Sequence, residues 1–250
     1  MEHNYYLVNG ADIDKKNSAA NQRAQAILKR KIEIFKEELA NKYNFILESD
    51  HFILSAGCGQ YCMEARVLNE VFPSSIVGVD LDVQEEISHG KLKVLKCSIE
   101  SMPFPDNYFK FVHCYHVLEH VNSPQKVLME FKRVLTEDGV IFIGFPNRLR
   151  MTPMYIKSHE NLSIAKKIKY NLRDYKQKFS GKFKNEYGAH AGFAESEFIN
   201  IAYPIFSKVK SIRKSYSKLI YPSFRKLIDF ASLLNADDYF FPSNYYILRK

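Results

Sequence analysis

The 250-residue chain is long enough for one large α/β domain with a buried core. Its hydrophobic content of 46% and charged content of 26% exclude wholesale disorder, and no run of apolar residues is long enough for a transmembrane helix. The first residues lack a basic start followed by an apolar stretch, so we expect no secretory signal and a cytoplasmic location.

The net charge of +8 is unevenly distributed along the chain. Residues 1–147 sum to −4 and residues 148–250 to +12, with 11 Lys and Arg but only 2 Asp and Glu between positions 148 and 184. A basic region behind an acidic front half indicates an anionic partner on one side of the molecule. A solvated, lysine-rich surface is the alternative interpretation.

The first half of the chain alternates apolar runs with helical patterns. Its periodicity predicts strands over 51–56, 75–80, 91–96, 108–114 and 139–145, and helices over 17–42, 63–71 and 123–135. Ser123 and Pro124 suit an N-cap and a first helical position, and residues 137–139, Glu-Asp-Gly, indicate a turn before the fifth strand. This alternation predicts a parallel sheet covered on both faces.

The second half begins with a segment that breaks this alternation. The pattern predicts helices over 163–178, 195–202 and, despite Pro222, 218–234, with strands over 205–212 and 244–248. We therefore predict one domain in four parts: an N-terminal helical segment (1–50), a core (51–147), a basic helical lid inserted after the fifth strand (148–186), and a completion of the sheet (187–250).

Residues 53–60, Ile-Leu-Ser-Ala-Gly-Cys-Gly-Gln, predict a strand that enters a helix through a Gly-x-Gly turn. Two glycines at such a turn let the backbone approach a ligand that a Cβ would exclude, and a plain tight turn is the alternative. Asp80 ends the next strand, where dinucleotide-type folds place an acid that accepts hydrogen bonds from ribose hydroxyls. The combination favours a ribose-binding acid over an acid in a loop.

Five blocks over residues 52–147 together resemble the class I S-adenosylmethionine-dependent methyltransferases of the small-molecule type. The blocks are 52–59, 76–80, 102–109, 116–121 and 131–147, and residues 190–198 are similar to a later segment of the family. The resemblance implies a Rossmann-like fold with a mostly parallel seven-stranded sheet whose last strand is antiparallel. It also implies S-adenosylmethionine as the cofactor and S-adenosylhomocysteine as its product.

The resemblance carries roles to individual positions. Gly57 and Gly59 would pass under the methionine part of the cofactor, Asp80 would hold the ribose, and Leu81 would pack on the adenine. The remaining implied contacts are Ser55 and Cys58 at the turn, Ser98 and Ile99 at the adenine edge, and Cys114 and Tyr115 near the transferred methyl group.

Four positions depart from the family's pattern. Ser55 and Ser98 stand where the family has acids, Tyr61 replaces a glycine, and Lys110 replaces an aspartate. A neutral acceptor holds a charged amine less strongly than a carboxylate does. These departures motivate an alternative function, that of a non-catalytic protein that keeps the fold as a binding or scaffold module.

Methyl transfer depends mainly on positioning the acceptor in line with the methyl group, because the sulfonium already makes that group electrophilic. A base is needed only where the acceptor must lose a proton. His116 and His190 are the candidates for that base, with a structural role as the alternative for each, whereas His120 is expected to be structural. No metal site is expected: the cysteines lack a second Cys/His pair at zinc spacing and are predicted to be reduced and mostly buried.

The basic insertion is expected to set the acceptor, because it follows the fifth strand and would overhang the carboxyl edge of the sheet. Its Lys and Arg residues, interleaved with Tyr and Phe, suit a phosphate, a sugar nucleotide, RNA or an anionic membrane surface. No recognisable RNA module accompanies them, so a phosphorylated, nucleotide-linked or glycan-like small acceptor is preferred to RNA or a membrane. The sequence leaves the oligomeric state open.

Overall fold

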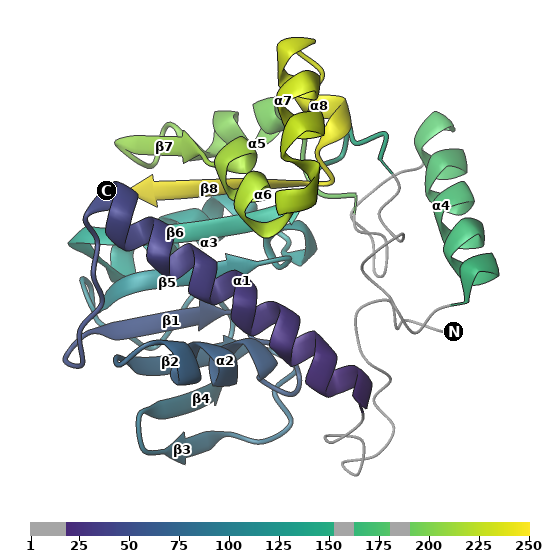
Figure 1. The fold of residues 1–250 in the computed structure, drawn as a ribbon. Helices are drawn as coiled ribbons and strands as arrows, with labels where there is room; N and C mark the ends of the chain where they lie inside the picture. The colour runs from purple at the N-terminus through teal and green to yellow at the C-terminus, as the bar shows by residue number, and fades with distance from the viewer. Residues whose placement is uncertain (1–18, 153–162, 181–190) are drawn as a thin grey trace.

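Eight strands form one sheet in the order β3-β4-β2-β1-β5-β6-β8-β7 in the computed structural model, which describes residues 19–152, 163–180 and 191–250 (Figure 1). The strands are β1 (Phe52–Ala56), β2 (Ser75–Asp80), β3 (Ile87–His89), β4 (Leu92–Lys96), β5 (Phe109–Tyr115), β6 (Leu135–Pro146), β7 (Lys208–Ser211) and β8 (Ser243–Arg249). Parallel pairing joins β4, β2, β1, β5 and β6, so their carboxyl ends lie at one edge of the sheet.

The predicted Rossmann-like fold is confirmed, including its antiparallel closing strand, because β8 runs antiparallel to both β6 and β7. The sheet has one more strand than the seven expected. The additional strand, β3, pairs antiparallel with the edge strand β4 over only three residues. A run this short carries too little periodicity to be predicted.

Helices cover both faces of the sheet (Figure 1). The helices α1 (Ala19–Tyr43), α2 (Met63–Val71) and α6 (Arg213–Ile220) pack on one face, and α3 (Pro124–Val134) and α5 (Glu195–Ala202) on the other. The remaining helices are α4 (Ile164–Phe179), α7 (Arg225–Leu233) and α8 (Asp237–Phe240), with short 3-10 turns η2 (Leu118–His120) and η3 (Pro222–Phe224). Within the described ranges, no helix is both long enough and apolar enough to cross a membrane.

Two local predictions are corrected by the structure. The turn expected at residues 137–139 lies inside β6, where the pairing with β5 shifts register between Phe109 and Phe111. The extra residues are absorbed as an irregularity in the strand. The helix expected over 218–234 is broken at Pro222 into α6, η3 and α7, because proline lacks the N–H that would continue the helical hydrogen bonds. Ser123 is confirmed as an N-cap and accepts a hydrogen bond from Lys126 N at 3.3 Å.

The basic insertion leaves and rejoins the sheet at the carboxyl end of β6. Arg148 N donates to Phe193 O at 3.2 Å, and the Arg148 guanidinium donates to Gly192 O at 2.9 Å and to Glu197 Oε1 at 2.5 Å. Gly192 has a φ of +72°, and a Cβ there would lie 1.6 Å from Pro146 O. Only glycine can occupy this position, where the returning chain passes next to Pro146.

Candidate cofactor-binding and active site

The Gly-x-Gly turn lies at the carboxyl end of β1. Gly57 and Gly59 have φ values of +73° and +76°, in the left-handed region that favours glycine. Gly57 N and Cys58 N donate to Val79 O at 2.8 and 3.1 Å, which fixes the turn against β2. A Cβ on Gly57 would come within 2.3 Å of the Val117 side chain, whereas a Cβ on Gly59 would meet nothing within 4 Å. Gly59 therefore leaves open space for a ligand.

Asp80, the last residue of β2, contacts this turn. Its Oδ2 accepts a hydrogen bond from Gly59 N at 2.8 Å, and its Oδ1 accepts one from Asp82 N at 2.9 Å. Each carboxylate oxygen has a second lone pair, so both can still accept a hydroxyl. A cavity of about 540 Å³ opens here, of the size that small-molecule sites have, and its lining residues are Gly59, Gln60, Asp80, Asp82, Val83, Gln84 and Lys96. The residues that line this cavity are suited to bind a nucleoside.

Behind the turn, Ser55 belongs to a buried polar cluster that the sequence did not reveal. Ser55 is fully buried, and its Oγ donates to Glu64 Oε1 at 3.2 Å. The same carboxylate oxygen lies 2.7 Å from His113 Nδ1. These three residues come from β1, α2 and β5. A carboxylate thus stands beside Ser55, the position at which the sequence lacks an acid.

His116 directly follows β5 and borders the glycine turn through its neighbour Val117. Its φ is +57°, and its backbone N donates to Gly144 O at 2.8 Å. His116 Nδ1 lies 3.3 Å from Oε1 of Glu119, whose side chain is fully buried, and His120 Nε2 lies 3.9 Å from the same oxygen. Burial lowers the pKa of His120. The Glu119 carboxylate therefore lies within ion-pair distance of both histidine rings.

Comparison with known proteins agrees with this geometry. The family model of the methyltransferase domain matches residues 54–143, a range that contains the glycine turn, Asp80 and His116. Over residues 54–143 the chain is therefore recognised as a class I S-adenosylmethionine-dependent methyltransferase domain. The match leaves residues 1–53 and 144–250, which include the basic insertion, outside the family model.

Relatives of the methyltransferase domain are distant. An uncharacterised methyltransferase of Schizosaccharomyces pombe is 33% identical over 136 residues, which cover 48% of this chain and 49% of that protein. The mitochondrial ubiquinone biosynthesis O-methyltransferase of Candida albicans is 28% identical over 127 residues, covering 46% of this chain and 37% of that protein. The chain thus aligns with about half, or less, of the length of these relatives.

The fold extends over nearly the whole chain. A crystal structure assigned as an S-adenosyl-L-methionine-dependent methyltransferase from Methanococcus maripaludis superposes with a TM-score of 0.53 at 13% identity. The superposition covers 98% of this chain and 97% of that one. At this identity the likeness concerns the fold alone.

Other residues singled out in the sequence lie around this site but do not line the cavity. Leu81 is 62% exposed, while the neighbouring Val83 is buried and lines the cavity instead. Ser98 Oγ accepts a hydrogen bond from Glu100 N at 3.2 Å, and Ile99 is buried in the core. Tyr115 stacks on Tyr245, with ring centroids 6.3 Å apart. Their roles toward the adenine and the methyl group stay predictions.

The cysteines of the methyltransferase domain are all free thiols, and Cys58, Cys62 and Cys114 are buried. Burial raises the pKa of Cys114 well above its usual range, and a hydrogen bond to Cys62, together with burial, raises the pKa of Cys58. A Cβ on Gly78 would approach Cys58 Sγ to 3.1 Å, so this side chain packs against β2. Packing is the role that the structure shows for them.

Two of the departures from the family's pattern are now placed. Lys110 is the second residue of β5, at the end of the strand away from the glycine turn, and it forms an ion pair with Asp138. A hydrogen bond from Lys110 lowers the pKa of Asp138. Lys110 therefore does not line the cavity.

Tyr61 lies inside the turn, where the next residue, Cys62, donates its N–H to Gly59 O at 3.1 Å. The other histidine candidate, His190, lies outside the described residues.

Proposed function

We propose that this chain transfers the methyl group of S-adenosylmethionine to an anionic small acceptor. The observation that carries the proposal is the contact between Gly59 N and the Asp80 carboxylate at the mouth of a cavity of about 540 Å³. This contact supports the proposal because a carboxylate that could accept ribose hydroxyls then lies beside an open glycine backbone at the carboxyl edge of a parallel sheet, where such folds bind their ligands.

S-adenosylmethionine, when bound, supplies an electrophilic methyl group on its sulfonium. The chain's own residues bind the cofactor and orient it. Asp80 accepts the ribose hydroxyls, and the backbone at Gly59 allows close approach because no Cβ occupies that space. Holding the reacting groups in line contributes most of the acceleration that such a reaction needs.

His116 is the residue proposed to take a proton from an acceptor hydroxyl. Its Nδ1 faces Glu119 at 3.3 Å, so Nε2 is the ring nitrogen that would receive the proton. The buried carboxylate of Glu119 would orient the imidazole and stabilise the imidazolium that forms, as the acid of a catalytic triad does. An acceptor that is already deprotonated would make this step unnecessary.

The acceptor class is inferred from the insertion that follows β6. Residues 148–184 contain 11 Lys and Arg and 2 Asp and Glu, in a chain whose first 147 residues sum to −4. An excess of positive charge in a segment that leaves the sheet at the carboxyl end of β6 favours a phosphorylated, nucleotide-linked or glycan-like acid as the acceptor. RNA methyl transfer is the second candidate, favoured by the same basic segment.

The first test is calorimetry with S-adenosylhomocysteine on the full chain and on Asp80→Ala. Removing the carboxylate should weaken binding by about 1–3 kcal/mol, because ribose hydroxyls would lose their acceptor. Asp50→Ala removes an acid whose side chain is 79% exposed, before β1 at the opposite edge, and should leave the affinity unchanged. An unchanged Asp80→Ala affinity would take Asp80 out of the site. If the full chain binds neither S-adenosylmethionine nor S-adenosylhomocysteine at millimolar concentration, it is a non-catalytic scaffold.

The second test follows methyl transfer to a panel of phosphorylated, nucleotide-linked and glycan acids, with RNA as a further arm. On an acceptor that loses a proton, His116→Gln should lower kcat by about 10²-fold or more while keeping the affinity for S-adenosylhomocysteine. His120→Gln, which changes the other histidine near Glu119, should retain the rate. Equal loss in both variants would indicate a structural role for His116, and transfer to RNA alone would select the second candidate.

A further inference from the structure

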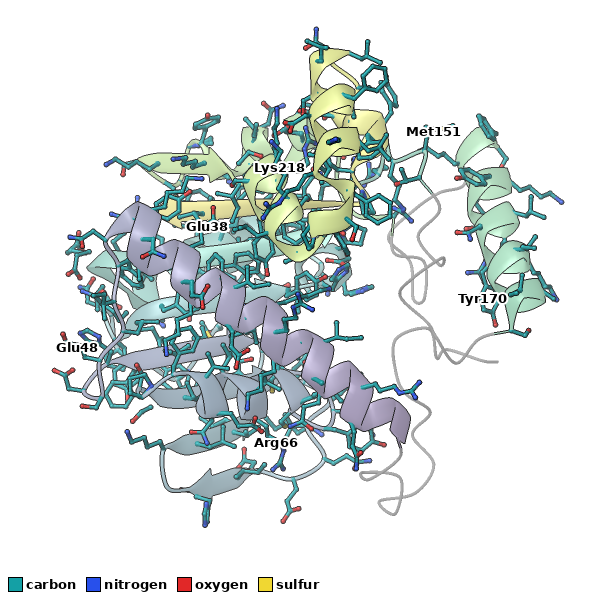
Figure 2. All side chains as sticks on the ribbon, in the orientation of Figure 1. Glu38, Glu48, Arg66, Met151, Tyr170 and Lys218 are labelled. Carbon is teal, nitrogen blue, oxygen red and sulfur yellow. The ribbon has the colours of Figure 1, made fainter. Side chains whose placement is uncertain are left out.

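Helix α4 carries an apolar stripe that the described part of the chain leaves uncovered. We define the stripe as Ile164, Ile168, Leu172 and Phe179, which are 77%, 54%, 62% and 77% exposed. At 3.6 residues per turn these positions fall within an arc of about 80° on one side of the helix. In Figures 1 and 2 the helix stands apart from the sheet, on the side toward which the central parallel strands point. An uncovered stripe of this size indicates an interaction surface.

The charge of α4 identifies the kind of partner. Its 16 residues contain six Lys or Arg and one Asp. By helical geometry, Lys169 and Lys176 fall on one flank of the stripe and Lys167 and Lys178 on the other. An apolar stripe between two basic flanks is the arrangement of helices that lie in the interface of an anionic bilayer.

The attachment of α4 to the domain uses its carboxyl-terminal half. Tyr175 Oη donates to Met151 O at 2.6 Å, and Lys178 Nζ donates to Arg150 O. Burial and the nearby charge of Arg150 lower the pKa of Lys178 to about 8. Lys178 therefore holds the helix to the residues that follow β6, which leaves the exposed Lys169 and Lys176 to meet lipid headgroups.

We propose that α4 docks this protein on the surface of an anionic membrane, with the apolar stripe at the boundary between headgroups and acyl chains. A second copy of the chain fits less well, because it would bring two strongly basic helices together. RNA would use the basic and aromatic residues but gains nothing from exposed Ile and Leu. The inference draws on basic residues that also support the proposed acceptor class, but its test is independent of methyl transfer, since membrane binding requires neither cofactor nor acceptor.

The test uses the absence of tryptophan from the chain. Leu172→Trp places a single indole in the stripe, and Ile46→Trp places one at a matched exposure of 63% against 62%. Ile46 lies two residues before Glu48, on the side of the domain away from α4 (Figure 2). Each full-length variant is mixed with vesicles of phosphatidylcholine alone, or of phosphatidylcholine with about one third phosphatidylglycerol.

We expect the emission of Leu172→Trp to shift to the blue with anionic vesicles, to return as salt is raised, and to stay unshifted with phosphatidylcholine alone. Ile46→Trp should not shift with either. In co-sedimentation, Ile168→Ser with Leu172→Ser should reduce the anionic-vesicle-bound fraction by about tenfold or more. Its thermal midpoint should match that of the unchanged protein, because both side chains are exposed.

Several results would overturn the proposal. No binding to anionic vesicles, or binding that the double serine variant retains, would remove the stripe from any membrane role. A dimer that the double variant dissociates would assign the stripe to a second copy. Tight binding of a single-stranded RNA oligonucleotide that anionic vesicles do not compete away would assign the basic residues to nucleic acid. Weakened S-adenosylhomocysteine binding in the double variant would show that the stripe covers the cofactor cavity instead.

Discussion

Helices α1 and α4 carry the same kind of apolar repeat, and the fold places the two repeats in opposite environments. In α1, Ile32, Phe35 and Leu39 are at most 2% exposed, whereas Ile168 and Leu172 of α4 are 54% and 62% exposed. The buried repeat of α1 packs against aromatic side chains of the sheet. The ring centroids of Phe35 and Phe142 lie 4.4 Å apart. A repeat shows that a helix has an apolar face, but not what covers that face.

Charge separates the two helices more clearly than hydrophobicity does. α1 has six basic and three acidic residues, and two of its lysines form ion pairs, Lys29 with Glu70 and Lys42 with Glu38. α4 has six basic residues and one acid. The exposed lysines of the core helix α1 thus have acidic partners nearby. The excess of basic residues in α4 suits the anionic surface proposed for it.

The comparison predicts its largest effect on the free energy of unfolding for a substitution at Phe35. Phe35→Ala should lower the free energy of unfolding by about 3–5 kcal/mol, because it removes a fully buried ring and leaves a cavity between α1 and the sheet. Urea unfolding followed by circular dichroism measures the change. A loss under about 1 kcal/mol would mean that α1 is not part of the cooperative core, and the contrast with α4 would disappear.

The smallest effect is expected at Ile168, at the same kind of position in α4. Ile168→Ala should change the free energy of unfolding by no more than about 0.5 kcal/mol, because the side chain is already 54% exposed and alanine is a good helix former. The same urea titration, without vesicles, provides the value. A loss comparable to that of Phe35→Ala would show that α4 is packed in solution.

Most of the sheet could be predicted because each signal is local. The observed bounds of α2 and β2 are those predicted, since each element is bounded by its own turn residues. The errors arise where distant contacts decide. Residues 137–139 have turn chemistry, yet pairing with β5 draws them into β6. The three-residue β3 and four-residue α8 were missed because neither is long enough to show a period.

The cofactor site was predictable to the same extent. Gly59 lies in the turn after β1 and Asp80 ends the neighbouring strand β2, so topology brings them together. Glu64 could not be found in this way, because its value lies in a contact with His113, 49 positions away, and in the burial of both side chains. Leu81 and Val83 follow the same strand, and only the loop conformation decides that Val83 lines the cavity.

The closure of the chain at Gly192 bears on how the length of this segment can vary. Arg148 and Gly192 are in direct contact, so everything between them starts and finishes at one point on the domain surface. The sheet therefore sets no length for this stretch, because its geometry constrains only the two ends. Insertions of different size and composition can be exchanged at this junction while the catalytic core keeps its shape. The stretch between Arg148 and Gly192 can thus change in evolution without altering the glycine turn or Asp80.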